Sequence, residues 1–113
     1  MASIAPNHIR PHLNTSDEQR LQYAIRGCDS RITKVSVWLG FDHAGQKTLY
    51  ACIVLNDDVT WKQGSTVQVG NRLSRISDVL RENAMRLKVS SRIEIEFLSE
   101  TEWSKIARLS HSI

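Results

Sequence analysis

Three segments decide the fold of this chain: ITKVSVWL at residues 32–39, LYACIVL at residues 49–55 and NRLSRISDVLRENAMRLK at residues 71–88. After its first positions, the first segment alternates apolar and polar residues, which is typical of a strand with one buried face. The second segment is apolar on both faces, which favours a central strand. The polar turn at residues 42–46 contains a glycine and predicts that the two segments form a β-hairpin.

The third segment is predicted to be an amphipathic helix. Its apolar residues recur at helical spacing and form one stripe, made of Leu73, Ile76, Leu80, Ala84 and Leu87. On the opposite side, Glu82 and Arg86 are spaced for an i,i+4 ion pair, and Arg75 and Asp78 are spaced for an i,i+3 pair. We therefore expect one side of this helix to cover a sheet and the other side to face water.

Two further strands are predicted on either side of this helix. One runs through Trp61 to Val69, with Val67 and Val69 as its inward pair. The other is Ile93 to Phe97, which alternates cleanly and has one wet face. A run of hairpin strands closed by a helix forms a sheet covered on one face, which is an α+β arrangement.

Two capping-box signatures mark the remaining helices. TSDE at residues 15–18 opens a helix that ends near residues 27–30, and SETE at residues 99–102 opens a short C-terminal helix. Residues 1–14 contain both prolines and are predicted to be a loosely ordered arm, in which His8 to Leu13 is the candidate for a short strand.

The predicted architecture is a single α+β domain over residues 15–113. The element order (β)αβββαβα implies a mostly antiparallel sheet of roughly four or five strands with helices packed on it. If the strand at residues 93–97 pairs with an earlier strand, the domain closes as a ferredoxin-like sandwich.

The composition is that of an ordinary globular domain. The 113 residues are 41% hydrophobic and 24% charged, and the fifteen basic residues are mixed with twelve acidic ones to give a net charge of +3. This balance permits an RNA partner without requiring one, because a nucleic-acid binder concentrates its cations on one face.

No apolar run approaches the roughly 20 residues that span a bilayer, and the N-terminus lacks a secretory pattern, so a cytoplasmic protein with no membrane partner is expected. Cys28 and Cys52 are predicted to be buried structural thiols.

No motif predicts catalysis, a cofactor or a metal. His8 and His12 have the spacing of a helical metal pair, but the prolines disfavour a helix there and no third ligand is near. Asp42–His43 is more simply a solvated turn than a catalytic dyad, and Asp57–Asp58 is more simply a turn than a calcium loop. We therefore predict a protein that is not an enzyme.

Aromatic and cationic residues share two predicted strand faces. Lys34 lies with Trp38 on one outward face, and Trp61 lies with Lys62 on another. Such a face can stack bases and neutralise phosphates. The alternative, which we favour because a C-terminal helix is available to cover the face, is that the tryptophans belong to the core.

Residues 14–88 resemble the ribosome hibernation-promoting factor family. The similarity lies in a first helix, the strand RITKVSVWL at residues 31–39, the strand LYACIVL at residues 49–55 and the long charged helix at residues 71–88. The resemblance implies βαβββα topology and binding in the ribosomal decoding region through basic residues on the helices. The matching positions in this chain are Arg20, Arg26, Arg75, Arg81, Arg86 and Lys88.

We therefore expect a small non-catalytic protein that binds ribosomal or other structured RNA. With Lys34 from the aromatic strand face added to the six helix positions, seven residues form the predicted nucleic-acid site. The alternative is a protein-interaction or homo-oligomerisation module, such as a dimer, that pairs with a partner or its own copy through a sheet edge such as residues 93–97. The even mixture of charges favours this alternative.

Overall fold

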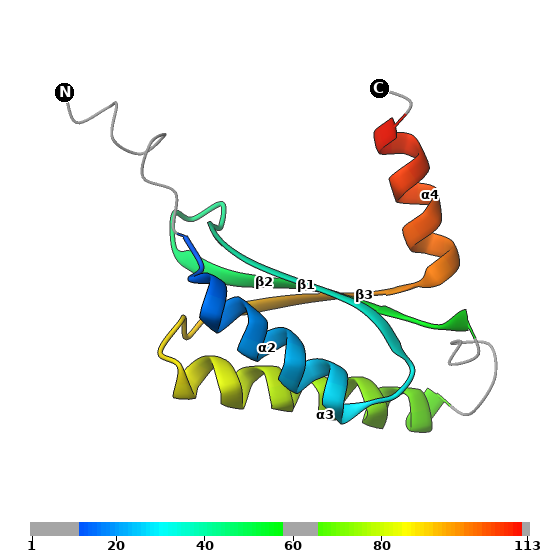
Figure 1. The fold of residues 1–113 in the computed structure, drawn as a ribbon, viewed down its shortest axis with the longest axis horizontal. Helices are drawn as coiled ribbons and strands as arrows, with labels where there is room; N and C mark the ends of the chain where they lie inside the picture. The colour runs from blue at the N-terminus through cyan, green and yellow to red at the C-terminus, as the bar shows by residue number, and fades with distance from the viewer. Residues whose placement is uncertain (1–11, 58–65, 112–113) are drawn as a thin grey trace.

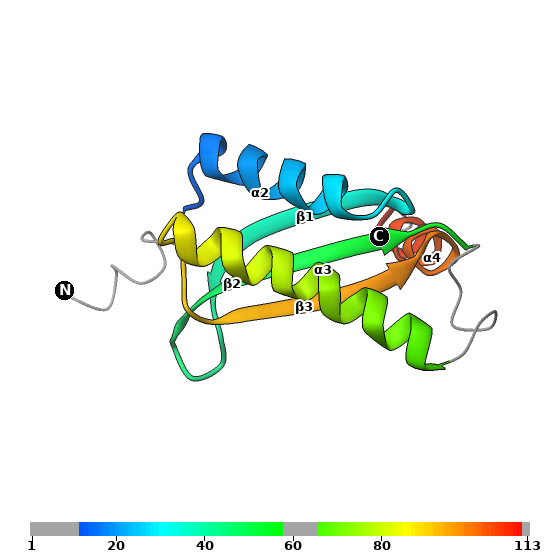
Figure 2. The same ribbon diagram turned by 90° about the horizontal axis from the view of Figure 1, so that it is seen from below.

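The computed structural model describes residues 12–57 and 66–111, which form an α+β fold with one mixed sheet (Figure 1). The elements, in chain order, are α2 (Thr15–Cys28), β1 (Ile32–Phe41), β2 (Lys47–Leu55), α3 (Thr66–Arg86), β3 (Ile93–Ser99) and α4 (Glu100–His111). Helices α2 and α3 lie side by side across one face of the sheet, and α4 rises from the other side (Figures 1 and 2). The α+β prediction is confirmed.

The sheet differs from the prediction in strand number and direction. In the described part of the chain it has three strands in the order β1-β2-β3, whereas the sequence predicts roughly four or five. β1 and β2 form the predicted antiparallel hairpin, but β3 pairs with β2 in parallel. The parallel pairing follows from the connection, because α3 carries the chain back across the sheet before β3 begins. β3 thus joins the sheet beside an earlier strand, as the sandwich alternative required.

The third strand predicted before α3 is wrong where it can be compared. Trp61 lies outside the described residues, whereas Val67 and Val69 belong to α3, which begins at Thr66. The two-residue spacing of these valines suits a strand, but Val69 also continues the helical stripe of Leu73 and Ile76 at i,i+4 and i,i+7 spacing. Val67 and Val69 therefore fit the two-residue period of a strand as well as the ~3.6-residue period of a helix, and in the structure they are part of the longer helix.

The core lies between the sheet and the α2–α3 layer. Its fully buried members come from α2 (Leu21, Ile25), from β2 (Leu49, Ile53, Leu55) and from α3 (Ile76, Leu80, Ala84). Leu73 and Leu87 pack against this cluster while partly exposed, so the whole predicted stripe of α3 faces the sheet. Leu13 joins the same cluster, so the last part of the predicted N-terminal arm packs on the domain.

The caps agree with the sequence at one helix and shift by one residue at the other. At α4, Ser99 Oγ accepts from the N–H of Glu102 at 3.1 Å, and Glu102 Oε1 accepts from the N–H of Ser99 at 3.0 Å, so this capping box is confirmed. At α2, the cap is Asn14 rather than Thr15, because the Asn14 side chain accepts from the N–H of Ser16 at 2.8 Å.

Removing the centre of the α3 stripe should destabilise the domain. Leu80→Ala leaves a cavity under the sheet and is expected to lower the free energy of unfolding by about 2–5 kcal/mol, measured by urea denaturation. Met85→Ala in the same helix removes a side chain that is 69% exposed, and should change it by less than about 0.5 kcal/mol. Equal effects of the two substitutions would contradict the placement of the core.

Candidate nucleic-acid interface

A groove between α2 and α3 brings two of the predicted cations together. It has a volume of about 590 Å³ and is lined from α2 by Ser16, Gln19, Arg20, Tyr23 and Ala24, and from α3 by Asn83, Arg86 and Leu87. No carboxylate is among these lining residues. Tyr23 is 83% exposed, so its ring is available at the groove for stacking. The groove combines two guanidinium groups with an exposed aromatic ring.

The groove follows from the same helix packing that forms the core. Leu21 and Ile25 point α2 at the sheet, which turns Arg20 and Tyr23 of the same helix toward its outer surface. On α3, Ala84 is buried while the neighbouring Arg86 is exposed. Sequence reasoning selected the arginines and missed Tyr23. The sequence feature that could have identified Tyr23 is its place outside the apolar stripe of an amphipathic helix, where an aromatic side chain is exposed.

The other predicted cations do not line this groove. Arg26 on α2 and Arg75 and Arg81 on α3 are exposed elsewhere on the helices. Lys88 is exposed just past the C-terminus of α3 and has a φ of 55°, a left-handed conformation that ends the helix. Lys34 lies on the opposite side of the sheet. The seven predicted residues therefore do not form one continuous surface.

The ion pairs of the described residues are not those that the sequence predicts on α3. Neither Glu82–Arg86 nor Arg75–Asp78 is formed. Instead, Arg72 lies 3.3 Å from Asp29 and ties the start of α3 to the turn after α2. The second pair, Arg92–Asp42, is described below. Because Arg75, Arg81 and Arg86 make no ion pair in the described chain, their charges face solvent.

The face of the sheet opposite α2 and α3 is only partly covered; we call it the open sheet face. Trp38, Tyr50 and Glu94 lie opposite one another on the three strands, and Ser36, Cys52 and Glu96 form the next row. The rings of Trp38 and Tyr50 are stacked, with centroids 5.8 Å apart and planes inclined by 14°. A groove of about 440 Å³ crosses this face and reaches Trp103 and Ile106 of α4.

The expectation that a C-terminal helix makes Trp38 part of the core is wrong. Trp38 is 47% exposed, because α4 leaves the sheet at the end of β3 and rises away from it (Figure 1). Lys34, the cation on the same strand face as Trp38, already makes a cation–π contact within the chain, because its Nζ lies 4.9 Å from the centre of the Trp103 ring. With Glu94 and Glu96 beside these rings, the face carries acids where a phosphate would need cations. It is poorly suited to a polyanion.

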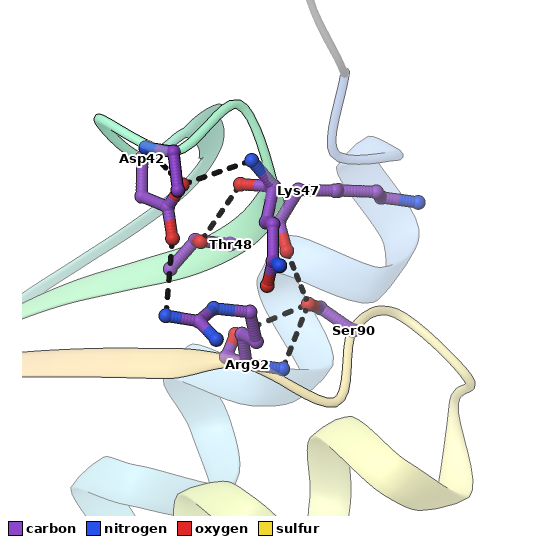
Figure 3. A network of polar contacts seen from close by, with 7 residues as sticks. Asp42, Lys47, Thr48, Ser90 and Arg92 are labelled. Atoms are coloured by element: carbon purple, nitrogen blue, oxygen red, sulfur yellow. Dashed lines mark hydrogen bonds and ion pairs between the residues drawn. The ribbon is translucent and has the colours of Figure 1, made fainter.

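Asp42, in the Asp42–His43 turn, forms a structural clamp with backbone amides of its own turn and with Arg92 (Figure 3). Asp42 Oδ1 accepts from the N–H groups of Ala44 and Gln46, both at 2.9 Å, and Oδ2 lies 3.1 Å from Arg92 Nη2. The Asp42 side chain is 3% exposed, so the expectation of a solvated turn is wrong for this residue, whereas His43 is exposed. The hydrogen bond from Gln46 is the main cause that lowers the pKa of Asp42; burial opposes it, and Ala44, Arg92 and His43 reinforce it.

The same clamp joins the hairpin to the start of β3. The N–H of Leu49 donates to the Arg92 carbonyl at 2.9 Å. Ser90 Oγ lies 3.2 Å from the Lys47 carbonyl and accepts from the N–H of Arg92 at 3.1 Å (Figure 3). Asp42, at the hairpin tip, therefore helps to fix where the parallel strand enters the sheet.

The remaining candidate groups have local structural roles. Asp57 accepts from the N–H of Thr101 at 3.3 Å and from its hydroxyl at 2.8 Å, which anchors the first turn of α4, while Asp58 lies outside the described residues. Cys28 and Cys52 are half-buried rather than buried, and burial raises the pKa of both thiols. Within residues 12–57 and 66–111, no three His, Cys, Asp or Glu side chains gather as a metal site requires. None of the described helices is long and apolar enough to cross a membrane.

No protein-family model matches this chain, and no curated protein or solved structure does. The resemblance to the hibernation-promoting factor family therefore stays a prediction.

Replacing the clamp carboxylate should change the pH dependence of stability. Asp42→Asn keeps an acceptor for the two amides but removes the charge opposite Arg92, so it should lower the melting temperature at pH 7. The pKa of Asp42 is lower in the folded chain than in the unfolded chain, where it is about 4. The ionised Asp42 therefore stabilises the fold above the unfolded pKa, and this stabilisation is lost as the pH falls through the folded pKa. The difference in melting temperature between the native chain and Asp42→Asn should therefore become smaller below pH ~4. Thermal melts followed by circular dichroism measure both effects.

Asp78→Asn is the matched control, since it removes an exposed carboxylate that makes no ion pair in the described chain. A melting temperature as low as that of Asp42→Asn at pH 7 would contradict the clamp.

Proposed function

We propose that this protein is a small non-catalytic RNA-binding protein and that the α2–α3 groove holds the RNA. The observation that carries the proposal is the lining of this groove, with Arg20 and Arg86 on its two walls, an exposed Tyr23 and no carboxylate. Guanidinium groups bind phosphate oxygens in a forked geometry, and an exposed ring stacks a base of any sequence.

The polar residues of the groove add hydrogen-bonding capacity. Asn83 uses its side-chain N–H to donate to the Val79 carbonyl at 2.7 Å, and its side-chain oxygen retains the capacity to accept a hydrogen bond. Gln19 lines the opposite wall. These amides suit base edges and 2′-hydroxyl groups, which RNA presents in unpaired segments. The groove therefore favours single-stranded regions of a structured RNA over a regular duplex.

The charge of the helical layer sets the expected strength of binding. Arg26, Arg75 and Arg81 add positive charge to the two helices outside the groove, whereas Asp78 and Glu82 on α3 reduce it. A layer of mixed charge gives weak long-range attraction, so affinity should depend on contacts within the groove. Ribosomal RNA is the partner that the family resemblance favours, with binding in the decoding region as the finer form of this proposal.

Removing the groove cations should weaken RNA binding and its salt dependence. For Arg20→Gln/Arg86→Gln, we expect lower affinity for a fluorescent single-stranded RNA, and a log–log salt slope that is shallower by about 1.4, because two phosphate contacts are lost. Tyr23→Ala should weaken binding roughly 5- to 150-fold through the loss of one stacked base. Fluorescence anisotropy over a salt series measures both quantities.

The control for charge is Arg31→Gln/Lys47→Gln, which removes two exposed cations outside the groove. Its affinity and salt slope should stay close to those of the native chain. If this control loses as much RNA affinity as the groove variant does, binding depends on net charge alone and the proposed site is wrong.

Ribosome association has its own test. In density gradients of cell lysate, the tagged protein should co-migrate with ribosomal particles at low salt and leave them at high salt, since phosphate contacts release counterions. Arg20→Gln/Arg86→Gln should migrate at the top under both conditions. Migration of the native chain at the top at low salt would contradict the ribosomal form of the proposal while leaving RNA binding to the anisotropy experiment.

A further inference from the structure

The open sheet face has the chemistry of a site for cationic side chains. Trp38 and Tyr50 present stacked rings, and Glu94 and Glu96 stand beside them on β3, exposed and without an ion pair in the described chain. Aromatic faces attract ammonium and guanidinium groups, and a nearby carboxylate strengthens that attraction. The chain already makes one such contact on this face, between Lys34 and Trp103.

Helix α4 carries cations that have no partner among the described residues of their own chain. Trp103 and Ile106 turn one side of α4 toward the open sheet face. Lys105 and Arg108 lie on another side, in a hollow that is also lined by Asp57, Glu100, Thr101 and Ser104. Lys105 and Arg108 are exposed and make no ion pair in residues 12–57 and 66–111. Helix α4 stands away from the sheet (Figure 1), and the exposed side chains of Lys105 and Arg108 are accessible to another molecule.

We propose that the open sheet face binds α4 of a second copy of this chain, so that two copies form a two-fold symmetric dimer. In this arrangement Lys105 and Arg108 of each copy lie against Glu94, Glu96 and the Trp38–Tyr50 stack of the other. A two-fold interface requires that one chain carry both halves of the contact, and the acids of β3 and the cations of α4 meet this requirement. Burial of Trp38 and of Ile106, which is 43% exposed, adds apolar contact.

The proposal does not depend on RNA binding, because α2 and α3 lie on the other side of the sheet (Figure 2). It also differs from edge pairing. The contact is made by side chains on the sheet face, so the outer edges of β1 and β3 in the described sheet are not needed for it.

Charge reversal in two complementary variants tests the dimer. Glu94→Lys/Glu96→Lys places cations opposite the cations of α4, and Lys105→Glu/Arg108→Glu places acids opposite the acids of β3. By light scattering after size exclusion, the native chain should have twice the mass of the 12.9 kDa monomer, and each variant alone should fall to the monomer mass. An equimolar mixture of the two should return to the dimer mass, because both contacts of the mixed dimer are again between opposite charges.

Matched controls reverse the same number of charges on α3, on the far side of the sheet. Asp78→Lys/Glu82→Lys and Arg75→Glu/Arg81→Glu should remain dimers, and circular dichroism should show native helix content in all four variants. A monomeric native chain over the accessible concentration range would overturn the proposal. So would a dimer that both reversals leave intact, or a mixture of variants that stays monomeric.

Discussion

The apolar contact between α3 and the sheet is the interaction on which the rest of the structure depends. Ile76, Leu80 and Ala84 lie fully buried in the core cluster with residues of the sheet, and the helix that carries them is also the connection between β2 and β3. Packing of this helix therefore returns the chain to the starting edge of β2, so that β3 pairs in parallel. The same packing sets α3 beside α2, and the groove with Arg20 and Arg86 lies along that junction. One buried stripe thus determines the sheet topology and places the candidate site.

A parallel strand needs its entry point fixed, and the Asp42 clamp supplies this. A hairpin fixes its register through its own turn, but β3 arrives from the end of α3 with no turn shared with β2. Arg92 is the residue just before β3, and its ion pair with Asp42 and its backbone bond to Leu49 hold it at the start of β2. The buried carboxylate at the hairpin tip is therefore explained by strand placement.

Local signals in the sequence predicted local structure, and non-local choices escaped them. The hairpin, the stripe of α3 and the Ser99–Glu102 capping box depend on neighbours in the chain, and all three are present. The direction of β3 depends on a distant partner, and the valines at residues 67 and 69 fit two periods at once. Arg20 and Arg86 could be listed from sequence, but their common groove and the role of Tyr23 depend on how two helices pack. The exposure of Trp38 depends on the direction in which α4 leaves β3, which no residue pattern encodes.

The two proposed surfaces lie on opposite sides of the sheet, and this separation has a consequence for binding strength. A single chain of net charge +3 with mixed charges on its helices offers modest attraction to RNA. A dimer formed through the open sheet faces turns both α2–α3 grooves outward, because each groove lies on the side of its sheet that the interface does not use. Under both proposals, the two grooves of one particle would bind two segments of the same RNA with an effective concentration set by their spacing. Under the two proposals together, self-association through the acidic and aromatic face compensates for the few cations available in each groove.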